Sequence, residues 1–321
     1  MPFIIMLFVM RIFPVGWSLV MSFTNYTGFN YNSFVFSEWT NYLRMINGKD
    51  PFFFDAIKST LIIVAFMVPM QTLISFSYAL LLNHDLRGNG LYRTVFYMPA
   101  ILPIIVTSLM WKLMFTYKDG VFTLIYRALG YEPLNWLGQT YQRSALFVML
   151  VWSGGSGMLT YLAGLKNIPV EQYEAGTIDG AGAFNKFRHI TLPTMTPIMF
   201  FNIVNGLVAS FQIFQQPVLL AQGAGNANLA AAVPAPTNYT YVVHAYQQFF
   251  QNNRFGYGLA LVWVLFIVSI IVTRLIFWSQ KFWVHYETDM DANAKRQQKA
   301  NRRLLKIAKE AQIAGKEGGA L

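Results

Sequence analysis

The stretch Leu61–Leu82 reads LIIVAFMVPMQTLISFSYALLL and contains no charged residue. About 20 apolar residues in an α-helix are enough to cross the hydrocarbon core of a bilayer, which is about 30 Å thick. Leu61–Leu82 therefore predicts a transmembrane helix. Pro69 lies inside it, but neighbouring helices and water can satisfy a carbonyl group that a proline leaves without a donor in a membrane bundle.

Five further stretches resemble the first in length and apolar character. The six predicted spans are 2–23, 61–82, 94–115, 144–165, 192–220 and 257–278. The first lacks a basic start and a small-residue cleavage site, so we interpret it as a retained span rather than a signal peptide. The alternative, buried helices of a large soluble protein, is disfavoured because the lengths match a bilayer so regularly.

The composition agrees with this interpretation and excludes several classes of protein. Of the 321 residues, 55% are hydrophobic and 12% are charged, whereas soluble domains carry about 25% charged residues. Cysteine is absent, which excludes a disulfide scaffold and thiolate metal sites. The chain has no phosphate-binding glycine motif and no catalytic motif, and its four histidines are scattered. We therefore expect an all-α polytopic membrane protein without a catalytic or metal site of its own.

The distribution of Lys and Arg predicts the orientation. More of them lie in the gaps 83–93 and 166–191 and in the segment after Ser279 than in the other gaps. Positive charge favours the cytoplasmic side, so both termini are predicted to be cytoplasmic. Residues 1–282 then form the membrane domain and residues 283–321 a basic tail. We expect the tail to meet anionic lipid headgroups rather than nucleic acid.

Three of the predicted spans carry polar residues at helical spacing. On the fifth span, four amides fall on one stripe at about 100° per residue. Buried amides are costly in lipid, so these residues should face protein or water. Hydrogen bonds between helices are one interpretation, and the lining of a pathway for a neutral, hydroxyl-rich solute is the other. The candidate pathway residues are Gln71, Ser75, Tyr78, Ser153, Ser156, Thr160, Asn202, Asn205, Gln212 and Gln216.

The predicted cytoplasmic loop 166–191 contains a short polar helix. Pro169 fits the first helical position, where no amide donor is needed, and the acidic residues that follow lie near the positive end of the helix. Gly180 can end the helix in the left-handed region. Ala175 and Gly176 keep its middle thin. Such a helix is shaped to enter a cleft on a cytoplasmic partner.

The run from Glu174 to Pro193 resembles the E-A-A-x-x-D-G-A…F-x-x-I-x-L-P loop of permease subunits of ATP-binding-cassette (ABC) importers. Gly176 stands where the motif has its second alanine. Three further segments, Ser22–Tyr26, Arg93–Pro99 and Asn135–Gly138, resemble the sugar-importing branch of these permeases. The residues that match the loop motif are Glu174, Ala175, Asp179, Gly180, Ala181, Phe187, Ile190, Leu192 and Pro193.

The resemblance implies a six-helix type I ABC importer (MetI-like) permease fold in a bacterial cytoplasmic membrane. It implies a non-catalytic subunit that imports a sugar or oligosaccharide, neutral or acidic (such as an alginate oligosaccharide), by alternating access. It also implies four partners: a second homologous permease, two ATPase subunits that hold ATP and Mg, and an extracytoplasmic solute-binding protein. The residues expected to dock on the ATPase are Tyr173, Glu174, Ala175, Gly176, Asp179, Gly180, Ala181, Phe187 and Pro193.

Three other functions stay open. An ion-coupled secondary carrier would need titratable or ion-coordinating groups deep in the bundle, and Arg11 is the one plausible candidate within a span. A membrane-embedded enzyme should show a paired acid and base, and none is visible in the predicted spans. A purely structural assembly subunit is the remaining alternative.

Overall fold

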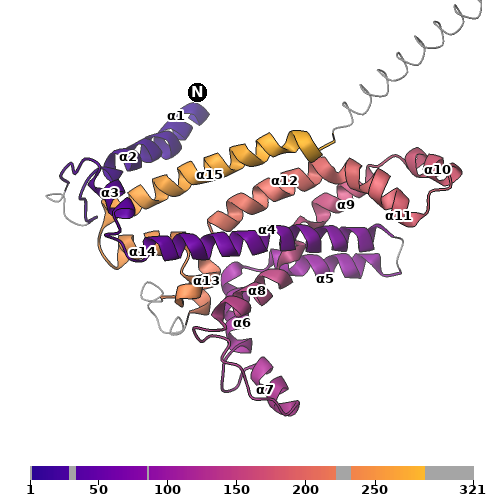
Figure 1. The fold of residues 1–321 in the computed structure, drawn as a ribbon, viewed down its shortest axis with the longest axis horizontal. Coiled ribbons are helices and arrows are strands. Elements are labelled where there is room, and N and C mark those ends of the chain that lie inside the picture. Colours follow the sequence, from indigo (N-terminus) through magenta and orange to yellow (C-terminus); the bar gives the residue numbers. More distant parts are fainter. Residues whose placement is uncertain (1, 29–33, 85–86, 222–232, 286–321) are drawn as a thin grey trace, which may run out of the picture.

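The computed structural model describes residues 2–28, 34–84, 87–221 and 233–285, and these parts of the chain are helical (Figure 1). The one β-bridge among them pairs Thr24 with Phe36. The fold therefore agrees with the prediction of an all-α protein. Of the predicted basic tail 283–321, the structure describes residues 283–285. The basic part of the tail lies outside the described residues.

The first span stands beside the bundle rather than in it (Figure 1). It consists of α1 (Pro2–Leu7), the π-helical turn η1 (Phe8–Ile12) and α2 (Phe13–Ser22). Ser22 is its one buried residue, so the apolar side chains of this span face outward. Helix α2 is joined to the last helix by a hydrogen bond from Trp263 to Ser18, and to the short helix Thr40–Ile46 by hydrogen bonds of Ser22 with Asn41 and Tyr42.

Helix α4 (Phe53–Asn83) is the central element of the bundle. It follows the short helix α3 (Thr40–Ile46) and begins eight residues before the predicted span 61–82. Pro69 lies in its interior, as the sequence predicts. Each of the five hydrophobic core clusters of the described residues includes a buried residue of α4, and α4 runs along the length of the molecule (Figure 1). The two ends of α4 therefore lie near the two opposite ends of the molecule.

The predicted third span 94–115 is not one straight helix. It is divided into α5 (Asn89–Ile101) and α6 (Ile104–Met114), which meet at an angle of 95°. Leu102 has an extended backbone there, because the ring of Pro103 disfavours the helical region for the residue before it. A short helix, α7 (Val121–Ala128), follows at the side of the bundle.

The fourth span is interrupted by glycines. It consists of α8 (Gln142–Trp152), the 3₁₀ turn η3 (Gly154–Gly157) and α9 (Met158–Lys166). The glycines let α4 and α5 approach closely. A Cβ atom on Gly154 would lie 3.0 Å from the side chain of Ile74, and one on Gly155 would lie 2.5 Å from the carbonyl oxygen of Phe96.

The predicted fifth span 192–220 is wrong at both ends. A helix begins earlier, with α11 (Ala183–Lys186) and the π-helical turn η4 (Phe187–Thr191), and continues as α12 (Leu192–Phe211). Residues Gln215–Leu220 form a separate helix, α13. Pro217 explains the break, because it has no amide hydrogen for the interior of a helix but fits the first turn of a new one.

The last elements are the 3₁₀ turn η6 (Pro236–Asn238), α14 (Tyr241–Phe250) and the long helix α15 (Phe255–Trp283). Among the described residues, five helices are long and apolar enough to cross a membrane. The bent α5–α6 pair makes up to six.

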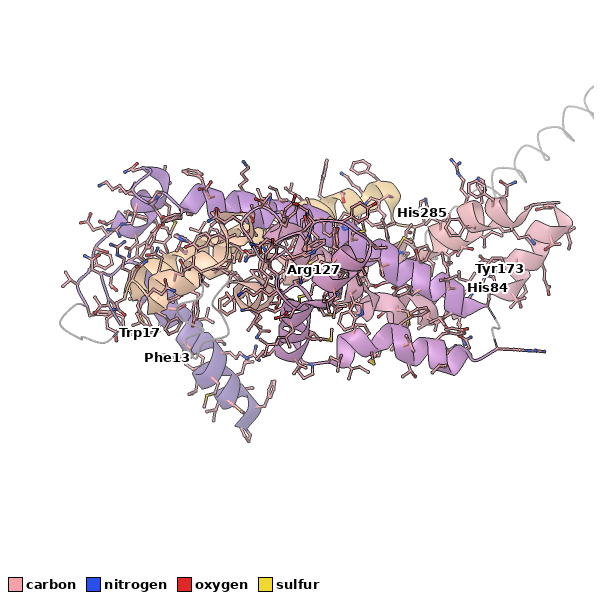
Figure 2. All side chains as sticks on the ribbon, turned by 90° about the horizontal axis from the view of Figure 1, so that it is seen from below. Phe13, Trp17, His84, Arg127, Tyr173 and His285 are labelled. Atoms are coloured by element: carbon pink, nitrogen blue, oxygen red, sulfur yellow. The ribbon has the colours of Figure 1, made fainter. Side chains whose placement is uncertain are left out.

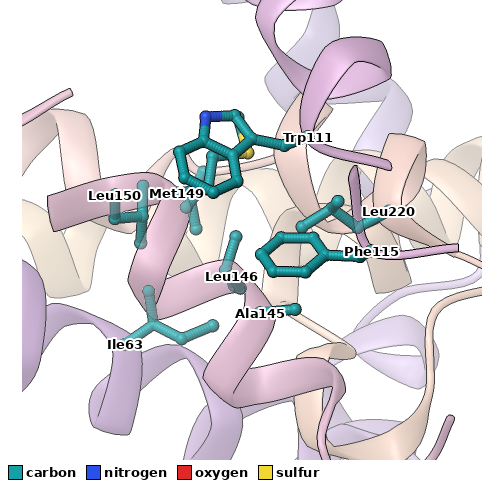
Figure 3. Packing of buried hydrophobic residues seen from close by; sticks show 9 residues of the cluster. Ile63, Trp111, Phe115, Ala145, Leu146, Met149, Leu150 and Leu220 are labelled. Atoms are coloured by element: carbon teal, nitrogen blue, oxygen red, sulfur yellow. The ribbon is translucent and has the colours of Figure 1, made fainter. Parts of the chain in front are cut away.

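Buried aromatic and aliphatic side chains hold the middle of the bundle together. In Figure 3, Trp111 of α6 and Phe115, directly after α6, lie against Leu146 and Met149 of α8, with Ile63 of α4 on the other side. The outside is apolar as well. Phe3, Leu113 and Leu275 are among many large hydrophobic residues that are exposed, as expected of helices that cross a membrane.

Candidate functional site

The short helix predicted in the loop 166–191 exists as α10 (Val170–Ile178). Pro169 is its N-cap residue, one position earlier than predicted. Gly180 has a φ of +76°, so the left-handed termination is confirmed. The amide of Gly180 donates to the carbonyl of Thr177 at 3.0 Å, and the amide of Ala181 to that of Gly176 at 2.8 Å. The helix is therefore closed by backbone hydrogen bonds of its own.

One face of α10 is attached to the bundle. The hydroxyls of Tyr173 and Thr191 are 2.9 Å apart and share a hydrogen bond. Tyr173, Phe187 and Ile190 pack against a hydrophobic cluster made by α4, α9 and α12. A short polar helix in a loop could have stood clear of the apolar spans, but α10 packs on the end of α4 that Tyr173 and His84 mark in Figure 2.

The other face of α10 is open. Glu174, Ala175, Asp179 and Gly180 are exposed. Next to them, Ile178 is 87% exposed and Phe184 is 70% exposed. Sequence reasoning missed these two, although large apolar residues in a polar loop were the available signal.

The predicted docking residues are therefore divided between the two faces of the loop. A Cβ atom on Gly176 would lie 3.1 Å from Cδ1 of Ile190, so Gly176 turns towards the η4 turn. The half-buried members Tyr173, Gly176, Ala181, Phe187 and Pro193 support the helix from within.

A polar cluster lies where α4, η3 and α12 meet. Nε2 of Gln71 donates to Oγ of Ser156 at 2.7 Å. Oγ of Ser75 donates to the carbonyl of Gly154 and accepts from the amide of Gly157 at 3.2 Å. Asn202 lies so close to Gly157 that a Cβ atom there would be 2.9 Å from its Oδ1. Four candidate pathway residues from three predicted spans are thus together.

The other candidate pathway residues are elsewhere. Gln212 comes after the end of α12 and Gln216 is in α13, so the predicted four-residue stripe is wrong. Asn205 is exposed and Tyr78 stacks on Phe96 with ring centroids 4.4 Å apart. The remaining two are Ser153, which donates to its own helix, and Thr160, which is exposed. That the cluster lines a pathway stays a prediction.

Buried polar residues also meet at the opposite end of α4. Nε2 of His244 lies 2.7 Å from Oδ2 of Asp50, and the hydroxyl of Tyr257 donates to the same oxygen at 2.5 Å. Burial raises the pKa of Asp50, but the hydrogen bonds from His244 and Tyr257 outweigh it and hold the pKa below its usual range. The hydroxyl of Tyr239 joins His244 to Gln247. This Asp50–His244 network was not predicted from the sequence.

The described residues hold no group of three or more His, Asp or Glu side chains that could bind a metal ion. The Asp50–His244 pair is fully used by its protein partners. The geometry offers a helix with an exposed face at one end of α4, a polar cluster midway and the buried Asp50–His244 network at the other end.

Comparisons with known proteins agree with one another. The family described as "Binding-protein-dependent transport system inner membrane component" matches residues 45–283. A probable ABC transporter permease of Bacillus subtilis is 32% identical over 290 residues, 89% of this chain and 90% of that protein. An arabinooligosaccharides transport system permease of Halalkalibacterium halodurans is 30% identical over 278 residues, 85% of this chain and 83% of that protein.

Solved structures share the fold. A chain of a bacterial ABC transporter involved in alginate import has a TM-score of 0.74 at 19% identity, covering 88% of this chain and 93% of that chain. A chain of the bacterial alginate ABC transporter in complex with an alginate pentasaccharide-bound periplasmic protein has a TM-score of 0.73 at 18% identity, covering 87% and 91%.

Proposed function

The chain belongs to the family of binding-protein-dependent transport system inner membrane components, and from this we propose that it is the permease subunit of an ATP-driven sugar importer. The related permease of arabinooligosaccharides and a related lactose permease of Rhizobium radiobacter support a sugar as the solute. The subunit itself performs no chemistry in this proposal, and ATP is hydrolysed by separate subunits.

The observation that carries the proposal is the exposure of Ile178 and Phe184 on a loop that is otherwise tied to the bundle. Exposed apolar residues beside acidic ones, as with Glu174 and Asp179, are typical of a protein–protein interface. We assign this face to the ATPase subunit. The loop and both termini are then cytoplasmic.

In this proposal the movement of α10 does the work of transport. Closure of the two ATPase subunits on ATP displaces α10, and the hydrogen bond and packing at Tyr173 pass the displacement to α12 and α4. Two homologous permeases then rock between inward- and outward-facing states around the solute. A binding protein delivers the sugar from outside, as expected from the alginate transporter complex of similar fold.

The test is uptake by the assembled complex in proteoliposomes, with both permeases, the ATPase subunits and the sugar-loaded binding protein. Ile178→Asp places a charge at the centre of the proposed interface, and stimulation of ATP hydrolysis by loaded binding protein should fall at least tenfold. Ile178→Leu is the matched control and should keep the stimulation. The proposal fails if uptake needs no ATP, or if Ile178→Asp leaves uptake and stimulation unchanged. Abolition of uptake by an ionophore, with ATP still present, would favour an ion-coupled carrier.

A further inference from the structure

A cavity of about 400 Å³ opens at the end of α4 that is opposite to α10. It lies between the beginning of α4, the segment that leads into α8, residues 233–239 and α14. Its volume falls within the range of about 300–1,000 Å³ that small-molecule sites occupy. Its chemically informative lining residues are Phe52, Asp55, Gln139, Gln142, Tyr239 and Gln247.

Aromatic rings and amides line this cavity together. The rings of Phe52 and Tyr239 have centroids 5.9 Å apart and are tilted against each other by 58°. A sugar ring has a flat face of C–H groups that packs on aromatic rings, and a rim of hydroxyls that pair with amides. The amide of Gln142 is already hydrogen-bonded to the carbonyl of Leu220 and the amide of Ala235. The lining thus offers a sugar unit the aromatic rings and the exposed amide of Gln139 at the rim.

Gln247 lines the cavity and carries an unpaired polar atom that is buried behind the lining. The side chain is only 8% exposed, yet its Nε2 atom has no partner, whereas its Oε1 atom accepts from the hydroxyl of Tyr239 at 2.6 Å. If the amide is turned over, the unpaired atom is the oxygen instead. Leaving a buried polar atom unpaired costs about 1–3 kcal/mol. Because this atom is itself buried, a ligand would reach it only after the side chain of Gln247 turns towards the cavity. A ligand hydroxyl can donate or accept, so it would then satisfy either orientation.

The charge of the lining selects among sugars. Asp55 is the only charged residue among the described residues that line the cavity. Arg143, one residue after Gln142, is engaged with the carbonyl of Thr237. A carboxylate without a lining cation disfavours an anionic sugar by repulsion. The hydroxyls of a neutral sugar can instead donate to Asp55.

We propose that this cavity is an outer subsite for a neutral oligosaccharide, which receives a sugar unit before the unit reaches the polar cluster at Gln71. The inference rests on the proposed function, since it assumes that the solute is a sugar and that this end faces outward. Asp55 and Gln71 are both on α4, so the subsite and the cluster are roughly 24 Å apart along that helix. The solute would then contact the outer subsite first and the polar cluster at Gln71 second.

The absence of cysteine from the chain makes a direct test possible. Gln139→Cys introduces one thiol at the exposed rim of the cavity, and Asn47→Cys introduces one at an exposed site that is not part of the lining. In the assembled complex without binding protein, the rate of labelling by a maleimide is measured on this chain. The probes are maltotriose and arabinotriose as neutral sugars and an alginate trisaccharide as the acidic one.

A neutral trisaccharide at millimolar concentration should slow labelling of Gln139→Cys at least threefold and leave Asn47→Cys unchanged. Equal slowing at both sites, or none at Gln139→Cys with either neutral sugar, would overturn the subsite. Protection by the alginate trisaccharide alone would overturn its neutral character. ATP-dependent uptake by the same preparation is measured in parallel, so a failure of the proposed function is seen separately.

A second pair of variants tests the aromatic side of the cavity. Phe52→Ala removes a lining ring, and Phe54→Ala removes an equally exposed ring that does not line the cavity. The concentration of neutral sugar that gives half-maximal protection of Gln139→Cys should rise at least fivefold with Phe52→Ala. It should stay unchanged with Phe54→Ala. Identical protection curves for the two variants would contradict a role for the aromatic lining.

Discussion

The hydroxyl of Tyr173 on α10 lies 2.9 Å from the hydroxyl of Thr191 at the start of α12, and a single hydrogen bond joins the exposed loop helix to a long helix of the bundle. Both residues also belong to the tightly packed end of the molecule: Tyr173 packs on the cluster of α4, α9 and α12, and Thr191 is buried. A force applied to α10 therefore has a short and direct route into α12.

A double-mutant cycle measures this connection. Tyr173→Phe and Thr191→Val each remove one hydroxyl and keep most of the packing volume, and each should lower stimulated ATP hydrolysis by about two- to fivefold. Because the two hydroxyls serve the same hydrogen bond, worth about 1 kcal/mol, the double variant should be no worse than either single variant. Additive losses would show that the two hydroxyls act independently.

Gly180 and Gly182 form a natural comparison at the end of α10. Gly180 has a φ of +76°, whereas Gly182 has a φ of −69° and open space around it. Gly180→Ala should destabilise the loop by about 1–2 kcal/mol, because an alanine in the left-handed region is strained. Gly182→Ala should have no effect. The check is ATPase binding to the permease pair, measured by co-purification and by titration; an equal effect of both substitutions would contradict the assigned termination.

Substitution of Gln71 tests whether the polar cluster lines a pathway or is a purely structural contact. Gln71→Leu removes the hydrogen bond to Ser156 and a polar surface, and Leu73→Ala changes an outward-facing residue of the same helix. A pathway role predicts that Gln71→Leu lowers sugar uptake at least tenfold per assembled complex while ATP hydrolysis continues. A structural role alone would instead lower the midpoint of thermal unfolding and leave uptake per folded complex unchanged.

The buried pair of Asp50 and His244 predicts a dependence on pH. The pKa of Asp50 is lowered in the folded chain, so the stabilisation it provides is complete above its unfolded value of about 3.9 and is lost as the pH falls through the lower folded value. Asp50→Asn should cost about 3 kcal/mol at neutral pH, because it breaks a buried pair. The measurement is thermal unfolding of the purified complex between pH 3 and 7.

Asp119→Asn is the matched control for that experiment, since Asp119 is exposed. Its unfolding profile should follow the parent chain at every pH. The Asp50→Asn variant should instead lose the decline in stability that the parent chain shows below about pH 4. An unchanged decline in Asp50→Asn would mean that other carboxylates cause it.

Much of the fold could be predicted because one continuous apolar stretch of sequence is enough to identify a transmembrane span. The positions of the α4 and α15 spans followed from this alone. The errors occurred where apolar composition does not distinguish one helix from two. Pro103 turns the α5–α6 pair by 95°, and Pro217 separates α13 from α12. Either proline could equally have caused only a kink.

The sites were predicted where their residues are close in the sequence. The left-handed Gly180 and the thin middle of α10 are local features, and they were found. Asp50 and His244 are 194 positions apart, so nothing in either neighbourhood points to the other. The stripe on the fifth span failed for a related reason: the spacing of Gln212 and Gln216 has meaning only if one helix continues through both.

Helix α4 has 31 residues and is roughly 46 Å long, and Pro69 is near its midpoint. The cavity lies at one extremity and the seat of α10 at the other. A rotation of 10° about the middle would carry each extremity sideways by about 4 Å, in opposite directions, given a rise of about 1.5 Å per residue. Pro69 thus lies where such a rotation would pivot, and a small displacement at the α10 end would become a displacement of similar size at the cavity end.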